Sequence, residues 1–163
     1  DYDDSYKLGY YAWKAAILQT VSKDLDGILI WCDAGNIISK KLSLLIKIIT
    51  KKQFYSPISS NRVVHWTHNS LIEKLELSKN ILKKRNLSSG LVCFDLSSDI
   101  SRKLIEQWFD WSKNKSLIAP DGSNRSNHRQ DQTLITLIYH SMIGKALIPK
   151  THKIFGVEFH QDI

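Results

Sequence analysis

The sequence has few of the features that mark membrane or disulfide-bonded proteins. No apolar run approaches the ~18 residues of a membrane-spanning helix, and the opening stretch, DYDDSYKLGYY, has neither a secretory nor a transit pattern. Only two cysteines occur, Cys32 and Cys93, and both lie inside apolar runs. A thiol in such a run behaves as a small hydrophobic group. We therefore expect two reduced core cysteines and no transmembrane segment.

Several motifs of nucleotide and hydrolase chemistry are also absent. The chain has no Gly-x-Ser-x-Gly nucleophile elbow, no P-loop and no dinucleotide-binding glycine fingerprint. These absences argue against a hydrolase with a nucleophile elbow and against the common nucleotide-binding loops.

The composition is that of an ordinary globular protein with a basic surface. With 163 residues, 42% apolar and 24% charged, residues 1–163 fit a single domain. The net charge of +7 is spread over separate lysine pairs, which suits either an anionic partner or a solvated basic surface. A basic nucleic-acid-binding module is less favoured, because the five tryptophans fall on amphipathic faces or strands and form no stacking platform. We therefore expect no nucleic-acid partner.

Helical and strand patterns alternate along the chain. Apolar residues recur at helical spacing over 10–24, 40–52, 68–77, 98–114 and 131–144, while 27–32, 62–67 and 90–94 are typical of short strands. Residues 114–129 are polar and have little periodicity, so they predict the longest loop. This alternation predicts an α/β fold with a mostly parallel sheet flanked by helices, in which strands 27–32 and 91–94 are adjacent or nearly so.

The first predicted strand ends in a polar tip, Asp33-Ala34-Gly35-Asn36. Because the carboxyl ends of parallel strands line the ligand crevice, Asp33 is placed to bind a metal, a ribose hydroxyl or a base. Gly35 would let a ligand approach the backbone. The alternative is that Asp33 and Asn36 form an Asx-turn and cap the helix after Ser39.

A second polar segment, HRQDQ, precedes the last predicted helix. Asp131 and Gln132 open that helix, and His128 and Arg129 come directly before them. A helix-capping role would explain Asp131, but it would not explain why His128, Arg129 and Gln132 lie beside it in the sequence. We expect the helix N-terminus and Arg129 to lower the pKa of Asp131.

Four segments in this order resemble glycosyltransferases of the GT-A type. They read GYYAWKAAIL, ILIWCDAGN, SSGLVCFD followed by IEQWFDW, and HRQDQTLITLI, and they cover roughly residues 9 to 140. The resemblance implies a GT-A-like fold that moves a sugar from a nucleotide-diphosphate donor to a glycan or other hydroxyl acceptor. A degenerate GT-A fold that binds a sugar or nucleotide without catalysis is the alternative. About 30 residues precede Asp33, too few for the usual N-terminal nucleotide-binding unit, so the chain is expected to lack it or to be a fragment.

The resemblance also implies roles for individual residues. Asp131 is the expected catalytic residue, Asp33 the expected ligand of a divalent metal, Mn²⁺ or Mg²⁺, and Lys14 the cation that neutralises the diphosphate. Gly35 stands where the family has a second acid, which puts metal dependence in doubt and leaves Asn36 or His152 as helpers of Asp33. The expected substrate-binding residues are Trp13, Lys14, Gly35, Asn36, Ser89, Gly90, His128, Arg129 and Gln132.

Two further positions depart from the family pattern. Tyr11 stands where the family usually has tryptophan, and Ala15 stands where it has proline. The expected location is cytoplasmic, or the lumen of the secretory pathway if the chain is a fragment of a membrane-anchored enzyme.

Overall fold

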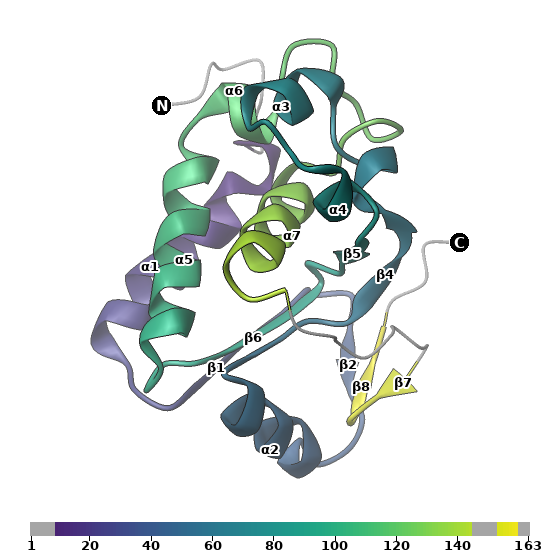
Figure 1. Cartoon of the computed structure of the whole chain (residues 1–163). Coiled ribbons are helices and arrows are strands. Elements are labelled where there is room, and N and C mark those ends of the chain that lie inside the picture. The colour runs from purple at the N-terminus through teal and green to yellow at the C-terminus, as the bar shows by residue number, and fades with distance from the viewer. Residues whose placement is uncertain (1–8, 145–152, 160–163) are drawn as a thin grey trace.

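The computed structural model describes residues 9–144 and 153–159, so His152 lies outside the described residues. Helices and strands are mixed, as the sequence predicts (Figure 1). Within the described part, no helix combines the length and the apolar character that crossing a membrane requires.

The central sheet has the strand order β1-β6-β3, formed by β1 (Ile28–Cys32), β6 (Leu91–Asp95) and β3 (Phe54–Tyr55). The predicted strands 27–32 and 91–94 are adjacent, as β1 and β6, so this prediction is confirmed. The prediction of a mostly parallel sheet is wrong. Both β1 and β3 pair with β6 in the antiparallel direction. Apolar patterning indicates which segments are strands and carries no information on the direction in which they pair.

The other strands form two small antiparallel sheets. β4 (Ile58–Arg62) pairs with β5 (Arg85–Leu87), and β2 (Ile37–Ile38) pairs with β8 (Val157–Glu158), which also pairs with β7 (Lys153–Ile154). The strand predicted over 62–67 is wrong, because Val63–His65 forms a 3₁₀ turn, η2, directly after β4.

Helices cover both faces of the central sheet. Three long helices, α1 (Ala12–Asp24), α5 (Asp99–Ser112) and α7 (Gln130–Met142), pack together on one side, while α2 (Ser43–Lys52) lies on the other side (Figure 1). The short 3₁₀ turn η1 (Gly9–Tyr11) precedes α1, and the short helices are α3 (Asn69–Lys74), α4 (Lys79–Leu82) and α6 (Lys115–Ile118). The last of these interrupts the loop predicted over 114–129.

Aromatic side chains join the sheet to the helices. Phe54 on β3 contacts Phe94 on β6 edge to face, with ring centroids 5.3 Å apart, and stacks on Tyr139 of α7 at 5.0 Å. Trp108 of α5 is fully buried and donates a hydrogen bond from Nε1 to the Asp131 backbone oxygen, at 3.2 Å. This packing fixes the first turn of α7 against α5.

Both cysteines are free thiols, as the sequence predicts. Cys93 is buried and Cys32 is half-buried. Burial raises the pKa of both thiols, and a raised pKa keeps a thiol protonated and unreactive at neutral pH.

Candidate functional site

The antiparallel pairing brings the polar end of β1 to the start of β6. Cys32 lies opposite Leu91 in the register, so Asp33, which follows β1, lies beside Ser89 and Gly90, which precede β6. The sequence predicts a ligand crevice beside Asp33 from the carboxyl ends of parallel strands. In the structure, Asp33 meets Ser89 and Gly90 because the carboxyl end of β1 adjoins the amino end of its antiparallel neighbour, β6.

A pocket of about 310 Å³ opens at this edge of the sheet. This volume is at the lower end of the range usual for small-molecule sites. Its lining comes from η1, α1, the β1 tip, the β6 start, the loop before α7, the first turn of α7 and the residue after β8. The lining residues are Tyr11, Lys14, Asp33, Gly35, Asn36, Ser88, Ser89, Gly90, Arg125, Arg129, Gln130, Asp131, Gln132 and Phe159.

The β1 tip is held by hydrogen bonds to backbone oxygens. The Asn36 backbone N–H donates to the Asp33 carbonyl oxygen at 2.9 Å, and the Asn36 side chain donates to the Gly90 carbonyl oxygen at 2.8 Å. The helix that follows, α2, has Leu42 at its N-cap with no side-chain capping bond. The alternative in which Asp33 and Asn36 cap this helix is therefore wrong, and the half-exposed Asp33 carboxylate faces the pocket.

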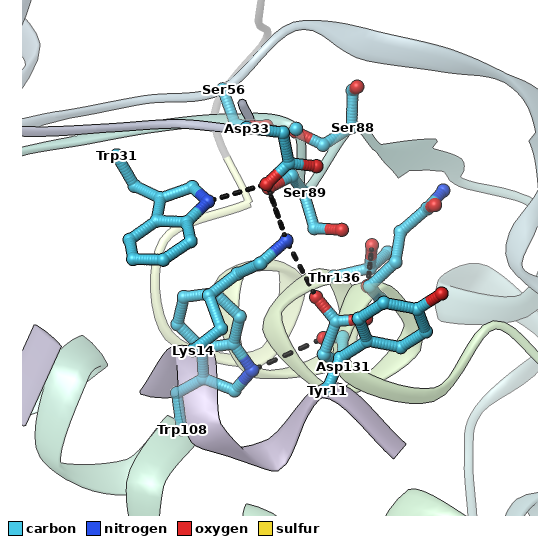
Figure 2. A network of polar contacts seen from close by, with 12 residues as sticks. Tyr11, Lys14, Trp31, Asp33, Ser56, Ser88, Ser89, Trp108, Asp131 and Thr136 are labelled. Carbon is cyan, nitrogen blue, oxygen red and sulfur yellow. Dashed lines mark hydrogen bonds and ion pairs between the residues drawn. The ribbon is translucent and has the colours of Figure 1, made fainter. Parts of the chain in front are cut away.

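Lys14 lies at the centre of the site, almost completely buried at 3% exposure. Its Nζ atom is 3.0 Å from Asp33 Oδ1, 3.3 Å from Asp131 Oδ2 and donates to the Ser89 carbonyl oxygen at 3.0 Å (Figure 2). An ammonium has three donors, and each of them has a partner here. Trp31 Nε1 also donates to Asp33 Oδ1, at 2.6 Å, so a network of polar contacts links α1, β1 and α7.

Asp131 lies in the first turn of α7 and is buried. Burial raises its pKa, against the opposing effects of the Lys14 charge and a Ser89 hydrogen bond. The sequence prediction of a lowered pKa is therefore wrong, because loss of hydration outweighs the neighbouring positive charge.

Arg129 lies over the ring of Trp66, 4.4 Å from its centroid.

Gly90 leaves space for a neighbouring side chain and does not need a special backbone angle. A Cβ atom at this position would lie 3.3 Å from Asp33 Oδ2 and 3.7 Å from Asn36 Nδ2. The glycine thus permits the close approach of the Asp33 carboxylate.

Two buried donors on the pocket residues have no hydrogen-bond partner in the described part of the chain. They are Arg129 Nε and Gln132 Nε2. Buried polar groups in proteins are nearly always paired, so each unpaired donor needs an explanation. An oxygen-rich ligand, such as a phosphate or a sugar hydroxyl, would supply the missing acceptors.

Two of the predicted substrate-binding residues do not line the pocket. Trp13 is 41% exposed and its ring lies 5.6 Å from that of Trp31. His128 is fully buried: its Nε2 atom is 2.9 Å from the Ile118 carbonyl oxygen, and its Nδ1 atom accepts from the His68 backbone N–H at 3.4 Å. His128 thus fastens the loop before α7 to its surroundings.

His128 should make stability depend on pH. Burial lowers the pKa of His128 to about 4 from its ordinary value of 6.5, so the unfolded chain takes up a proton before the folded one does. The contribution is intact above pH ~6.5 and should be lost progressively as the pH falls toward ~4, by about 3 kcal/mol in total. Urea unfolding at several pH values should show this loss in the wild type and a flatter profile in His128→Gln. Parallel profiles for the two proteins would contradict the assignment.

Sequence reasoning missed five residues of the pocket: Tyr11, Ser88, Arg125, Gln130 and Phe159. Arg125 donates from Nη2 to the Tyr11 hydroxyl at 2.8 Å. Tyr11 and Gln130 have left-handed backbone angles, with φ of 66° and 41°, an arrangement that is costly for non-glycine residues and clusters at functional sites. No pattern in the sequence reports these angles.

The groups around Asp33 are poorly suited to act as ligands of a divalent metal ion. Asp33 Oδ1 already contacts Lys14 Nζ and Trp31 Nε1, and the second carboxylate of the pocket, Asp131, contacts the same ammonium. Over residues 9–144 and 153–159, no group of three or more histidine, cysteine, aspartate or glutamate side chains could hold a metal ion. Mg²⁺ and Mn²⁺ prefer several oxygen ligands, whereas the unpaired buried groups here include two N–H donors.

Nothing matches the chain in comparisons with models of protein families, with curated proteins and with solved structures.

Proposed function

We propose that this protein is a glycosyltransferase that uses a nucleotide-diphosphate sugar as donor and a glycan or other hydroxyl as acceptor. One observation carries the proposal. Residues from all four motif-bearing regions, which together span more than a hundred positions, converge on one pocket: Lys14, Asp33, Ser89 with Gly90, and Asp131 with Gln132.

The charges of the pocket suit such a donor. Lys14, Arg125 and Arg129 provide three cations against the carboxylates of Asp33 and Asp131, so an approaching diphosphate meets an excess of positive charge. Fixed cations near a leaving group stabilise the negative charge that builds on it in the transition state. Arg129 Nε and Gln132 Nε2 offer free donors to phosphate or hydroxyl oxygens.

Asp131 is the residue best suited to take part in the reaction. In an inverting transfer, the acceptor oxygen forms a bond to the anomeric carbon, the bond from that carbon to the diphosphate breaks, and the diphosphate leaves with the electron pair. The acceptor proton passes to a general base. A carboxylate with a raised pKa is a stronger base than a solvated one, and burial gives Asp131 this property. In a retaining transfer, Asp131 would instead hold sugar hydroxyls.

A sugar- or nucleotide-binding protein without catalysis is the second candidate. The observation in its favour is that Lys14 contacts the Asp131 carboxylate, which reduces its freedom to accept a proton. Calorimetric titration with UDP- and GDP-sugars, followed by an assay for release of nucleoside diphosphate, separates the two candidates. Binding without turnover would favour the second.

Asp33→Ala should weaken binding of the nucleotide sugar by about tenfold, the size of effect expected when one polar contact with a ligand is lost. The Asp33 carboxylate is half-exposed and faces the pocket, so its removal leaves the backbone turn intact. Asp24→Ala, which removes an exposed acid at the end of α1, is the matched control. An unchanged dissociation constant in a folded Asp33→Ala protein would remove Asp33 from the binding site.

A further inference from the structure

The floor of the pocket contains a buried cation that two carboxylates share. Lys14 Nζ lies between Asp33 Oδ1 and Asp131 Oδ2, at 3.0 and 3.3 Å. The ammonium also donates to the Ser89 carbonyl oxygen and lies 5.5 Å from the Trp31 ring centroid. A charge that is 97% removed from solvent must be paired to be tolerated. Here two carboxylates and a carbonyl oxygen pair with the ammonium.

This cation occupies the place that a metal bridging the two acids would take. Such an ion would take its ligands from the Asp33 and Asp131 carboxylates, and one oxygen of each, Asp33 Oδ1 and Asp131 Oδ2, already contacts Lys14 (Figure 2). A dication and an ammonium at the same two oxygens repel each other strongly in a poorly solvated site. The position of the missing second acid, Gly35, offers no carboxylate in compensation.

The anchoring of Lys14 favours a permanent role for it. Its neighbours on the inner face of α1, Ala12, Ala15 and Leu18, are buried in the core. The helix therefore cannot turn the lysine outward without exposing apolar side chains.

We propose that Lys14 is the fixed internal cation of this pocket, and that it excludes a divalent metal from Asp33 and Asp131 so that a nucleoside diphosphate binds without one. The identity of the ligand rests on the proposed function. The exclusion of metal by Lys14 does not, and the two parts are tested separately.

The first test compares binding of UDP and GDP to the whole chain in EDTA and in MnCl₂, by calorimetry. The dissociation constant of whichever nucleotide binds should agree within about twofold between the two conditions, whereas a required metal would change it by about tenfold or more. A loss of affinity of that size in EDTA would overturn the proposal. Binding of neither nucleotide in either condition would count against the proposed function, and the second test then decides the role of Lys14.

The second test needs no nucleotide. Melting temperatures of the wild type, Lys14→Met and Lys23→Met are measured with and without about 1 mM MnCl₂. A ligand that binds only the folded state raises the melting temperature. Lys23 is an exposed lysine of the same helix and serves as the control. Mn²⁺ should stabilise only Lys14→Met, in which both carboxylates are released.

Two outcomes of the second test would overturn the proposal. One is that Mn²⁺ stabilises the wild type as much as Lys14→Met, and the other is that it stabilises neither. If Lys14→Met does not fold, Lys14→Gln, which keeps a hydrogen-bond donor without the charge, replaces it under the same criteria, and the wild-type comparison in EDTA stands by itself.

Discussion

Asp131→Asn is expected to lower the rate of sugar transfer by about a hundredfold or more, the usual contribution of a general base. Asparagine keeps the size and shape of the side chain but cannot accept the acceptor's proton. The fold should survive, because Lys14 retains its contacts with Asp33 and with the Ser89 carbonyl oxygen.

The difference in stability between the wild type and this variant should depend on pH. Because the pKa of Asp131 is raised in the folded state, the ionised carboxylate costs folding free energy. That cost is absent below the ordinary pKa near 4 and grows as the pH rises toward the folded-state pKa. Asp131→Asn removes the cost, so its melting temperature should equal or exceed that of the wild type at neutral pH.

The measurement pairs thermal melting with release of nucleoside diphosphate from the donor that binds, in the presence of an acceptor panel. Asp99→Asn is the matched control, since Asp99 is an exposed acid in the first turn of another helix, α5. A sharply lower melting temperature together with normal transfer per folded molecule would make Asp131 a structural residue and leave the proposed reaction without its base.

Lys14→Met should destabilise the protein by about 3–5 kcal/mol at neutral pH, the usual result of removing one partner from a buried ion pair. Methionine has a similar length and fills the space of the aliphatic stem, so the loss reports the charge rather than a cavity. Asp131 would then be buried without its cation, and only the Ser89 hydrogen bond would still favour its charged form.

The destabilisation of Lys14→Met should decrease as the pH falls, because protonation of Asp131 removes the uncompensated charge. Urea unfolding of Lys14→Met and Lys23→Met at pH 7 and near pH 4 measures this difference. Equal stability of the two variants at pH 7 would mean that Lys14 contributes no net stabilisation and that the contacts around Nζ are incidental.

The basic composition by itself does not define a partner. Within the pocket, however, the cations have distinct surroundings: Lys14 is buried between acids, Arg129 lies over Trp66, and Arg125 contacts Tyr11 at the rim. Of the lysines and arginines that the structure describes, three line the proposed donor site.

The sequence by itself determined the long helices, the two main strands and most of the candidate residues. Apolar periodicity located α1, α5, α7, β1 and β6, because the hydrophobic face of each element repeats with its own period. The polar tip after β1 and the HRQDQ segment could be recognised because carboxylates, amides and cations at element ends have no place in a core. Most of the residues selected in this way line the pocket.

Only the tertiary structure decided how these groups act on one another. The antiparallel pairing of β1 with β6 brings Asp33 beside Gly90, and strand direction depends on the path of the chain between the two strands. The raised pKa of Asp131 depends on how deeply α7 is buried, and the burial of His128 depends on the fold of the loop before that helix. Lys14 pairs with two acids that lie 19 and 117 positions away; such long-range electrostatics arises from packing and leaves no local pattern in the sequence.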